Sequence, residues 1–309
     1  MGVTLSLTRS ALGLGRWYVR YVPGTLGKAP LIARSLNVGL REQPRHAVAR
    51  TVFGDRFAVD TVDLIQRFIY MFGVWEPHLS HWLRARLRPG DVFVDVGANI
   101  GYFSVLGSRL VGASGKVVSV EASPEFHRRL LIQAHLNECE NIRAVNCGVS
   151  DKSETLRFTL ASSRNMGANS IVPYDGPIES TFGIDAHPLA EILTSEEVAR
   201  IRVMKIDVEG AEGAAVRGLL PILDHLRSDA EIVVEVTPSR MAELGYSVTE
   251  LIDAFKGRGF HVYRLANDYD ASAYPATLRR ASLAPVRWRG PVVEESDLVF
   301  SRVDADTLP

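Results

Sequence analysis

Residues 92–101 read VFVDVGANIG, an apolar strand that runs directly into a glycine turn. A strand is predicted at 92–96 because four of these five residues are apolar, as in strands buried on both faces of a parallel sheet. The apolar pattern of 102–111 is that of a helix, and a second predicted strand, 116–120, ends at Glu121. Strand, glycine turn, helix, strand and acid in this order predict the first half of a nucleotide-binding α/β domain.

The same alternation of strands and helices continues toward the C-terminus. Further strands are predicted at 142–146, 202–206, 231–236, 260–265 and 297–301. Helices are predicted at 124–137, 211–220 and 248–258. This pattern predicts an α/β fold with a doubly wound, mostly parallel sheet covered on both faces. The sheet has seven predicted strands, one more than the dinucleotide-binding fold.

The remaining segments suggest additions to this core. Residues 1–75 are expected to form an N-terminal extension and cap, with a hairpin of strands 51–53 and 57–59 that leads into a helix near 62–70. The main domain is then 76–309. Within it, 153–161 reads as an edge strand or hairpin, and 162–185 as a long loop of the kind that often binds a ligand.

Composition limits the class of protein. The net charge of −1 gives no overall attraction to nucleic acid, and no nucleic-acid partner is expected. The two cysteines match neither a disulfide framework nor a zinc ribbon, which favours a reducing, cytoplasmic location. The sequence gives no indication of the oligomeric state.

The N-terminus is unusual in its charge. Residues 1–41 contain six basic residues and no acidic one. Arg9, Arg16 and Arg20 interrupt every apolar run that a secretory signal would need, so no signal peptide is expected. A helix packed on the rest of the protein is the preferred interpretation, and a weak contact with an anionic membrane surface, at the inner membrane face, is the alternative.

The glycine turn favours one class of cofactor. Asn99 replaces the middle glycine that lets a pyrophosphate approach the backbone, and Asp95 places a carboxylate where phosphates need neutral or positive surroundings. An amino acid's ammonium suits Asp95 better, and ribose hydroxyls suit Glu121. S-adenosylmethionine carries both groups, so it is the predicted cofactor, and a NAD-dependent dehydrogenase is disfavoured.

Three motifs together resemble the FkbM family of S-adenosylmethionine-dependent methyltransferases: DVGANIG at 95–101, EASP at 121–124 and KIDVEGAE at 205–212. The resemblance implies a class I, Rossmann-like fold with a seventh, antiparallel strand at the sheet edge, and methyl transfer, usually to oxygen. It also implies that Glu121 binds the ribose. The other implied cofactor contacts are Asp95, Gly97, Asn99 and Gly101 at the methionine part, and Asn146 to Gly148 at the adenine.

The third motif carries the candidate chemistry. Residues two apart on a strand face one side, so Lys205, Asp207 and Glu209 are expected to point together where the predicted strand ends. Methyl transfer requires alignment of the reactants and removal of the acceptor's proton, and Asp207 or Glu209 is the predicted base. A purely structural ion pair from Lys205 to Glu209 or Glu212 is the alternative. Carboxylates also suit magnesium, but no second ligand cluster is evident, and no metal site is predicted.

Other residues are weaker candidates. His187, near Asp185, is a further candidate base because a neutral imidazole accepts protons near pH 7, although an ordinary loop histidine is the simpler interpretation. Tyr70, Phe72 and Trp75 could line an acceptor pocket, and core packing is the simpler interpretation for them. Tyr102 and Phe103, which open the helix after the glycine turn, are expected near the cofactor.

The sequence therefore predicts a methyltransferase that acts on a hydroxyl of a sugar, glycolipid or secondary metabolite, so the partner is a small-molecule or glycoconjugate acceptor. The hydroxyl is implied by the resemblance. The alternatives are an N-methyltransferase, a metal-assisted diol O-methyltransferase and a non-catalytic cofactor-binding module, the last disfavoured by Asp207 and Glu209.

Overall fold

The computed structural model describes residues 2–161, 178–266, 270–278 and 283–308. These residues form two compact units. The N-terminal unit comprises 2–81 and 270–278, and the sheet unit comprises the other described residues. Within these ranges, no helix combines the length and apolar character that crossing a bilayer requires.

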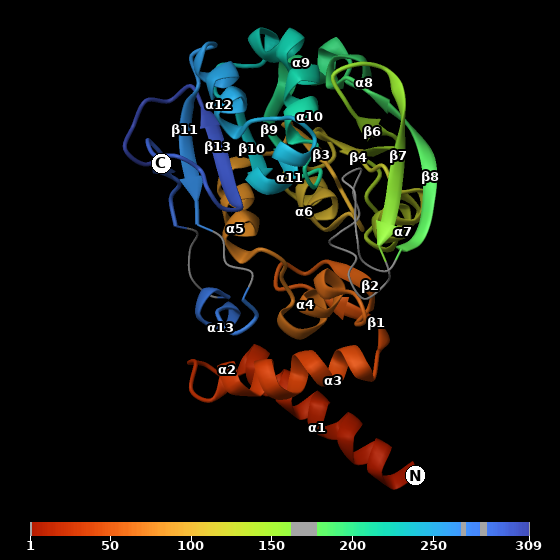
Figure 1. Cartoon of the computed structure of the whole chain (residues 1–309). Helices are drawn as coiled ribbons and strands as arrows, with labels where there is room; N and C mark the ends of the chain where they lie inside the picture. Colours follow the sequence, from red (N-terminus) through yellow and green to blue (C-terminus); the bar gives the residue numbers. More distant parts are fainter. Residues whose placement is uncertain (1, 162–177, 267–269, 279–282, 309) are drawn as a thin grey trace. The chain divides into compact units, whose positions relative to one another are not determined.

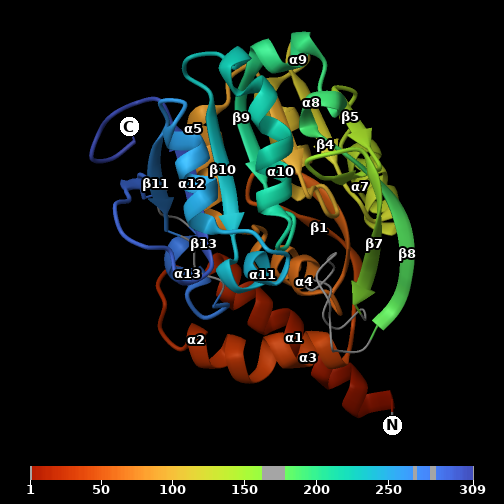
Figure 2. The same ribbon diagram turned by 45° about the horizontal axis from the view of Figure 1, so that its top comes forward.

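The sheet unit contains a mixed eight-stranded sheet (Figures 1 and 2). Its order is β12-β11-β13-β10-β9-β3-β4-β5. The strands are β3 Val92–Val96, β4 Lys116–Val120, β5 Ile142–Val145, β9 Ile201–Ile206, β10 Glu231–Val236, β11 His261–Leu265, β12 Val286–Arg287 and β13 Ser296–Ser301. All seven predicted strands are present, and only the two-residue β12 was not predicted. The predicted α/β fold with a mostly parallel sheet is confirmed.

The position expected for the antiparallel strand is wrong. β13 runs antiparallel to both of its neighbours, and these neighbours are β10 and β11. It therefore lies inside the sheet, while β11 and β12 extend the sheet beyond it. Buried on both faces, β13 is as apolar at its centre as the parallel strands, with Leu298, Val299 and Phe300 all inaccessible to solvent.

Helices come before and between the strands of this sheet along the chain. They are α5 Pro77–Arg86, which begins in the N-terminal unit, α6 Tyr102–Val111, α7 Pro124–Leu136, α8 Leu189–Ile192, α9 Ser195–Arg200, α10 Glu212–Leu219, the 3-10 helix η3 Leu220–His225, α11 Pro238–Glu243 and α12 Val248–Lys256. From β3 the chain adds β4 and β5 in one direction, and it then returns to add β9 and β10 in the other. The strand order thus reverses between β3 and β9, where open α/β sheets bind ligands at the carboxyl ends of the strands.

A second, three-stranded sheet follows β5. It has the order β6-β8-β7, with β6 Gly148–Val149, β7 Glu154–Ala161 and β8 Ile178–His187. The strands β7 and β8 form a long, curved antiparallel hairpin (Figure 2). The edge strand predicted at 153–161 is confirmed as β7, whereas the loop predicted at 162–185 is too long, because 178–185 belong to β8. Residues 162–177 lie outside the described residues.

The N-terminal unit is built mainly from helices, with a small hairpin. Its elements are α1 Gly2–Tyr21, α2 Lys28–Leu31, the π-helix η1 Ile32–Leu36, α3 Asn37–Glu42, β1 His46–Arg50, β2 Arg56–Asp60, α4 Leu64–Phe72 and α13 Tyr274–Thr277. The strand predicted at 51–53 is wrong, and β1 lies just before it. The Thr51 hydroxyl accepts hydrogen bonds from the amides of Phe53 and Asp55, which stabilises a turn there. In the core, Phe68 packs edge-on against Phe72, Trp75 and Tyr274.

Several basic residues of the N-terminus point inward. Arg16 donates to the carbonyl of Tyr70 at 2.6 Å, and Lys28 donates to the carbonyl of Val19 at 3.0 Å. The guanidinium of Arg20 donates to the carbonyl of Arg50. These side chains attach α1 to other elements of its own unit, in which Leu12 and Val19 are also buried.

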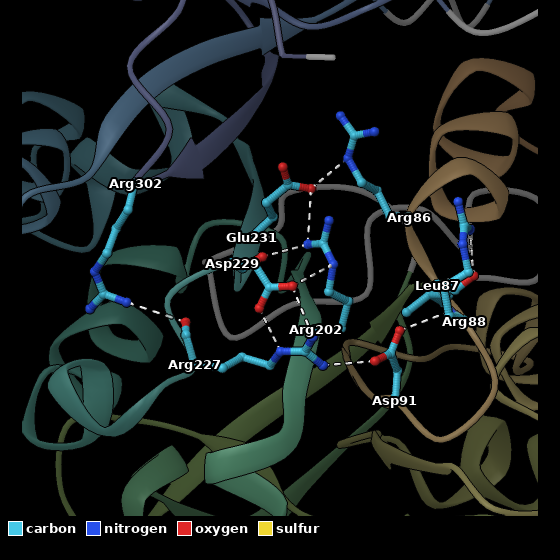
Figure 3. Close-up of polar contacts among 9 residues, drawn as sticks. All are labelled: Arg86, Leu87, Arg88, Asp91, Arg202, Arg227, Asp229, Glu231 and Arg302. Atoms are coloured by element: carbon cyan, nitrogen blue, oxygen red, sulfur yellow. Dashed lines mark hydrogen bonds and ion pairs between the residues drawn. The ribbon is translucent and has the colours of Figure 1, made fainter.

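An ion-pair network ties together the amino ends of three strands (Figure 3). Glu231, at the start of β10, accepts from Arg86 at 2.6 Å and lies 3.3 Å from Arg202 of β9. Arg227 continues the chain of contacts from Asp229 to Asp91, which precedes β3. Because β3, β9 and β10 are parallel, their amino ends lie together, and this network is at the end of the strands opposite to their carboxyl ends.

Candidate active site

The turn after β3 is held tightly against the end of β9. Gly97 has a φ of +78°, and a Cβ on it would lie 1.7 Å from the carbonyl oxygen of Asp207. Only glycine fits both the conformation and the contact. Gly97 thus lets the two carboxyl-terminal strand ends meet where the strand order reverses.

Asp95 is a buried acid with one unused oxygen. Its Oδ2 accepts from the Ser104 hydroxyl at 2.6 Å, and its Oδ1 is buried without a hydrogen-bond partner. Burial raises the pKa of this carboxyl, and the charge of Lys205, its register partner on β9, opposes the rise. A buried acceptor without a donor is costly, so the site suits a ligand that brings a cationic donor.

Glu121 ends β4 on the other side of β3. It accepts from the amides of Asn99 at 2.7 Å and Ser123 at 2.8 Å, which fixes the carboxylate beside the glycine turn. Burial raises its pKa to about 7 in spite of these two donors. Two carboxylate oxygens offer about four acceptor positions, so capacity remains for ribose hydroxyls.

The other predicted cofactor residues surround this turn. Asn99 has a φ of +51°, and Gly101 begins α6 with a φ of +86° where a Cβ would meet Leu130 of α7 at 2.9 Å. Asn146 donates to the carbonyl of Glu121 at 2.8 Å, which joins the ends of β4 and β5. Gly148 lies in β6, where a Cβ would meet Ile184 of β8 at 2.9 Å. Gly101 and Gly148 therefore have a packing role, and their cofactor contacts stay predictions.

At the end of β9, Lys205 lies between a carboxylate and a ring. Its Nζ donates to Asp207 at 2.7 Å and lies 5.2 Å from the centroid of the Phe103 ring, which brings the start of α6 to this site. The Lys205 side chain is 4% exposed, whereas that of Asp207 is 23% exposed. Asp207 is thus the member of this ion pair that solvent, or an acceptor, can reach.

Glu209 does not share the orientation expected from strand geometry. The strand β9 ends at Ile206, and Glu209 has a φ of +53°, so the alternation of side chains stops before it. Its carboxylate pairs with Arg240 of α11. Burial and the charge of Asp207 raise the pKa of Glu209, and Arg240 opposes the rise. Asn99 and Glu209 are two of four described non-glycine residues with positive φ, a conformation that clusters at functional sites.

Glu212, in the first turn of α10, is a further buried acid. Its Oε1 accepts from the amide of Gly210 at 2.8 Å, and its Oε2 is buried without a hydrogen-bond partner. Burial raises its pKa to about 7. Sequence reasoning did not single out Arg240, because no motif links a residue after β10 with the end of β9.

His187 takes part in none of the contacts described above. Its Nδ1 is 2.9 Å from the hydroxyl of Ser153, which also donates to Glu191 at 2.6 Å. His187 ends β8, Ser153 precedes β7 and Glu191 lies in α8. The catalytic role of His187 stays a prediction. Tyr70, Phe72 and Trp75 are buried in the N-terminal unit, in agreement with core packing. Among the described residues, no group of three or more His, Cys, Asp or Glu side chains is arranged to hold a metal ion.

The chain is similar in sequence to known methyltransferases. The chain matches the family model of the methyltransferase FkbM domain over residues 95–262, more than half of its length. It is 28% identical over 197 residues to the 31-O-demethyl-FK506 methyltransferase FkbM of Streptomyces tacrolimicus, covering 57% of this chain and 75% of that protein. It is 31% identical over 100 residues to protein-L-isoaspartate O-methyltransferase 2 of Archaeoglobus fulgidus, covering 32% of this chain and 44% of that protein. The match thus spans less than half of the Archaeoglobus protein.

Among solved structures, methyltransferase FkbM from Methylobacillus flagellatus KT aligns with 77% of this chain and 55% of its own, at 16% identity and a TM-score of 0.37. The family match confirms the resemblance drawn from the three motifs. The matched domain is a methyltransferase domain, which agrees with methyl transfer as the predicted activity and with S-adenosylmethionine as the predicted methyl donor. The chain belongs to the FkbM family of methyltransferases.

Proposed function

We propose that this protein methylates a hydroxyl group of a sugar, glycolipid or secondary metabolite, and that Asp207 removes the proton of that hydroxyl. The observation that carries the proposal is the position of Asp207. Its backbone touches the glycine turn at Gly97, and its side chain is partly exposed beside Lys205. An acid at this point lies between the cofactor residues and the solvent side of the site.

The residues present fit the methyl donor. Asp95 offers its unused buried oxygen to the ammonium, and Glu121 offers its remaining acceptor positions to the ribose. S-adenosylmethionine supplies a methyl group already activated by its sulfonium. The protein therefore has to orient the acceptor and take up its proton, which is the task of positioned acids and bases.

A hydroxyl acceptor is supported by two observations. The relative from Streptomyces tacrolimicus is named for methylation of an oxygen. In addition, Asp207, Glu209 and Glu212 place three carboxyl groups near the end of β9, and a hydroxyl must lose its proton as its oxygen attacks. Glu209 is the second candidate for the base, because a raised pKa suits proton uptake near neutral pH.

The test uses labelled S-adenosylmethionine with lipid, glycan and metabolite extracts, followed by mass spectrometry of the labelled product. We expect a methyl ether, turnover lost in Asp207→Asn, and S-adenosylhomocysteine affinity kept within a few-fold. The control is Asp253→Asn on the exposed face of α12, which we expect to retain full turnover.

Other outcomes would refute parts of this proposal. A methylated amine, or turnover abolished by chelators and restored by magnesium, would contradict simple methylation of a hydroxyl. Unchanged turnover in Asp207→Asn combined with lost turnover in Glu209→Gln would transfer the role of base to Glu209. Binding of NAD but not S-adenosylhomocysteine would contradict the whole assignment.

A further inference from the structure

We infer that the outer face of α1 is a docking surface for an anionic lipid membrane. This face, here called the apolar stripe, consists of Leu14, Trp17 and Tyr21, and Leu26 follows it in the next turn of the chain. The inference does not depend on the identity of the methyl acceptor.

Helix α1 has an apolar face on each of two sides. On one side, Leu12 and Val19 are buried within the N-terminal unit. The apolar stripe has the opposite character, because Leu14 is 69% exposed and Trp17 and Tyr21 are each 54% exposed. Leu26 is 87% exposed. Steps of three and four residues place the members of the stripe on one side of the helix, so they form a continuous surface.

The sequence extends this spacing toward the N-terminus. Steps of three and four lead upstream from Leu14 to Ser10, Leu7 and Val3. The helix contains no acidic residue over its whole length, Gly2–Tyr21. Such a helix resembles those that lie in the plane of a membrane interface, with an apolar face and basic flanks.

Charge identifies the partner. Residues 1–81 contain ten basic and five acidic residues, a net charge of +5. The whole chain has a net charge of −1, so residues 82–309 carry −6. The two parts of the chain therefore carry opposite net charges, which nearly cancel in the net charge of the whole chain. Arg34 and Arg41, on η1 and α3, are exposed and follow α1 in the same unit.

An anionic bilayer explains both features together. Lipid headgroups attract the exposed basic residues, such as Arg34 and Arg41, and the acyl boundary accepts the apolar stripe, with tryptophan and tyrosine preferring the interface between the two. A second copy of the chain would bring one basic helix against another, which costs repulsion. A nucleic acid would satisfy the charge but would leave the exposed leucines in water.

The test uses the full-length protein and sedimentation with two kinds of vesicle. We expect binding to vesicles that mix phosphatidylcholine with phosphatidylglycerol, weak binding to pure phosphatidylcholine, and loss of binding at high salt. The double variant Leu14→Ser, Trp17→Ser is expected to bind about tenfold more weakly, because both side chains lose apolar area. The control Val48→Ser removes an exposed apolar side chain from β1 of the same unit and is expected to bind like the wild type.

Specific results would overturn the inference. They are no binding to the anionic vesicles, equal binding to both kinds of vesicle, or undiminished binding by a Leu14→Ser, Trp17→Ser variant with wild-type Tm. Analytical ultracentrifugation adds a further arm. A dimer that this double variant disrupts would identify a second copy as the partner, and salt-sensitive RNA binding in place of vesicle binding would identify a nucleic acid.

Discussion

Replacement of Gly97 by alanine tests whether the contact between the glycine turn and the end of β9 creates the site. A Cβ at this position would lie 1.7 Å from the carbonyl oxygen of Asp207, whereas real Cβ contacts begin near 3.0 Å. The two strand ends would have to separate by the difference, and displacement of reacting groups by about 1 Å costs roughly 10²-fold in rate. The left-handed conformation adds about 1–2 kcal/mol of backbone strain, and the clash about 1–3 kcal/mol.

Gly259→Ala is the matched control. Gly259 has a φ of +77°, against +78° for Gly97, and a Cβ there would meet no atom within 4 Å. The control therefore measures backbone strain alone, which in a domain of this size lowers Tm by about 2–8 °C. We expect Gly97→Ala to lower Tm further, to weaken S-adenosylhomocysteine binding in calorimetry, and to lower kcat/KM about 10²-fold. If both variants had the same Tm, cofactor affinity and kcat/KM, the contact would have no role in the site.

Three further predictions concern the acids and the ion pairs. The pKa of Glu121 is raised to about 7 in the folded protein, so between about pH 4.5 and 7 the folded state holds a proton that the unfolded chain has lost. The contribution of Glu121 to stability therefore falls as pH rises through this range. Cofactor affinity should rise over the same range, because ribose hydroxyls donate to the ionised carboxylate; calorimetry from pH 5.5 to 8 tests this, and Glu121→Gln should flatten both trends. Arg240→Gln tests the second candidate base: an acidic limb of the pH-rate profile that moves to higher pH would assign proton transfer to Glu209, since Arg240 opposes the rise in the pKa of Glu209, and an unmoved limb would exclude Glu209. Glu231→Gln should lower the free energy of unfolding by about 3 kcal/mol, because it leaves Arg86 and Arg202 facing a neutral amide. Calorimetry should show a Tm lower by about 6–12 °C and an unaltered cofactor affinity. An unchanged Tm would contradict a stabilising network.

The strands of the main sheet were predictable because burial on both faces leaves continuous apolar runs, such as those of β3 and β10. Their order was only partly predictable. The apolar run at β13 gives no sign of its partners, so its position between β10 and β11 could not be read from the sequence. The hairpin β1–β2 was displaced in the prediction because hydrogen bonds to the Thr51 hydroxyl convert an apolar run into a turn.

At the site, too, features set by neighbouring residues in the sequence were predictable, and contacts between distant segments were not. Asp95, Gly97 and Glu121 could be predicted as site residues from their spacing, because each lies within a few residues of a strand end. The backbone reversal at Glu209 was not predictable, since glutamate seldom adopts a positive φ and only Gly210 suggested a turn. The contacts of Phe103 with Lys205 and of Arg240 with Glu209 join elements that are far apart in the chain, and only the fold brings them together.

The amino and carboxyl ends of the parallel strands differ in how completely their acids are paired. At the amino ends, Asp91, Asp229 and Glu231 all contact arginines, so burial of these charges is compensated within the protein. At the carboxyl ends, Asp95 and Glu212 each keep a buried oxygen without a donor. A folded protein retains few such groups, because each one is costly. Buried polar atoms without a partner also occur elsewhere in the described residues, as in Trp82 and Trp288, so what distinguishes the carboxyl ends is that two acids there keep such atoms near the left-handed Asn99 and Glu209. This arrangement suits ligands that bring the missing donors.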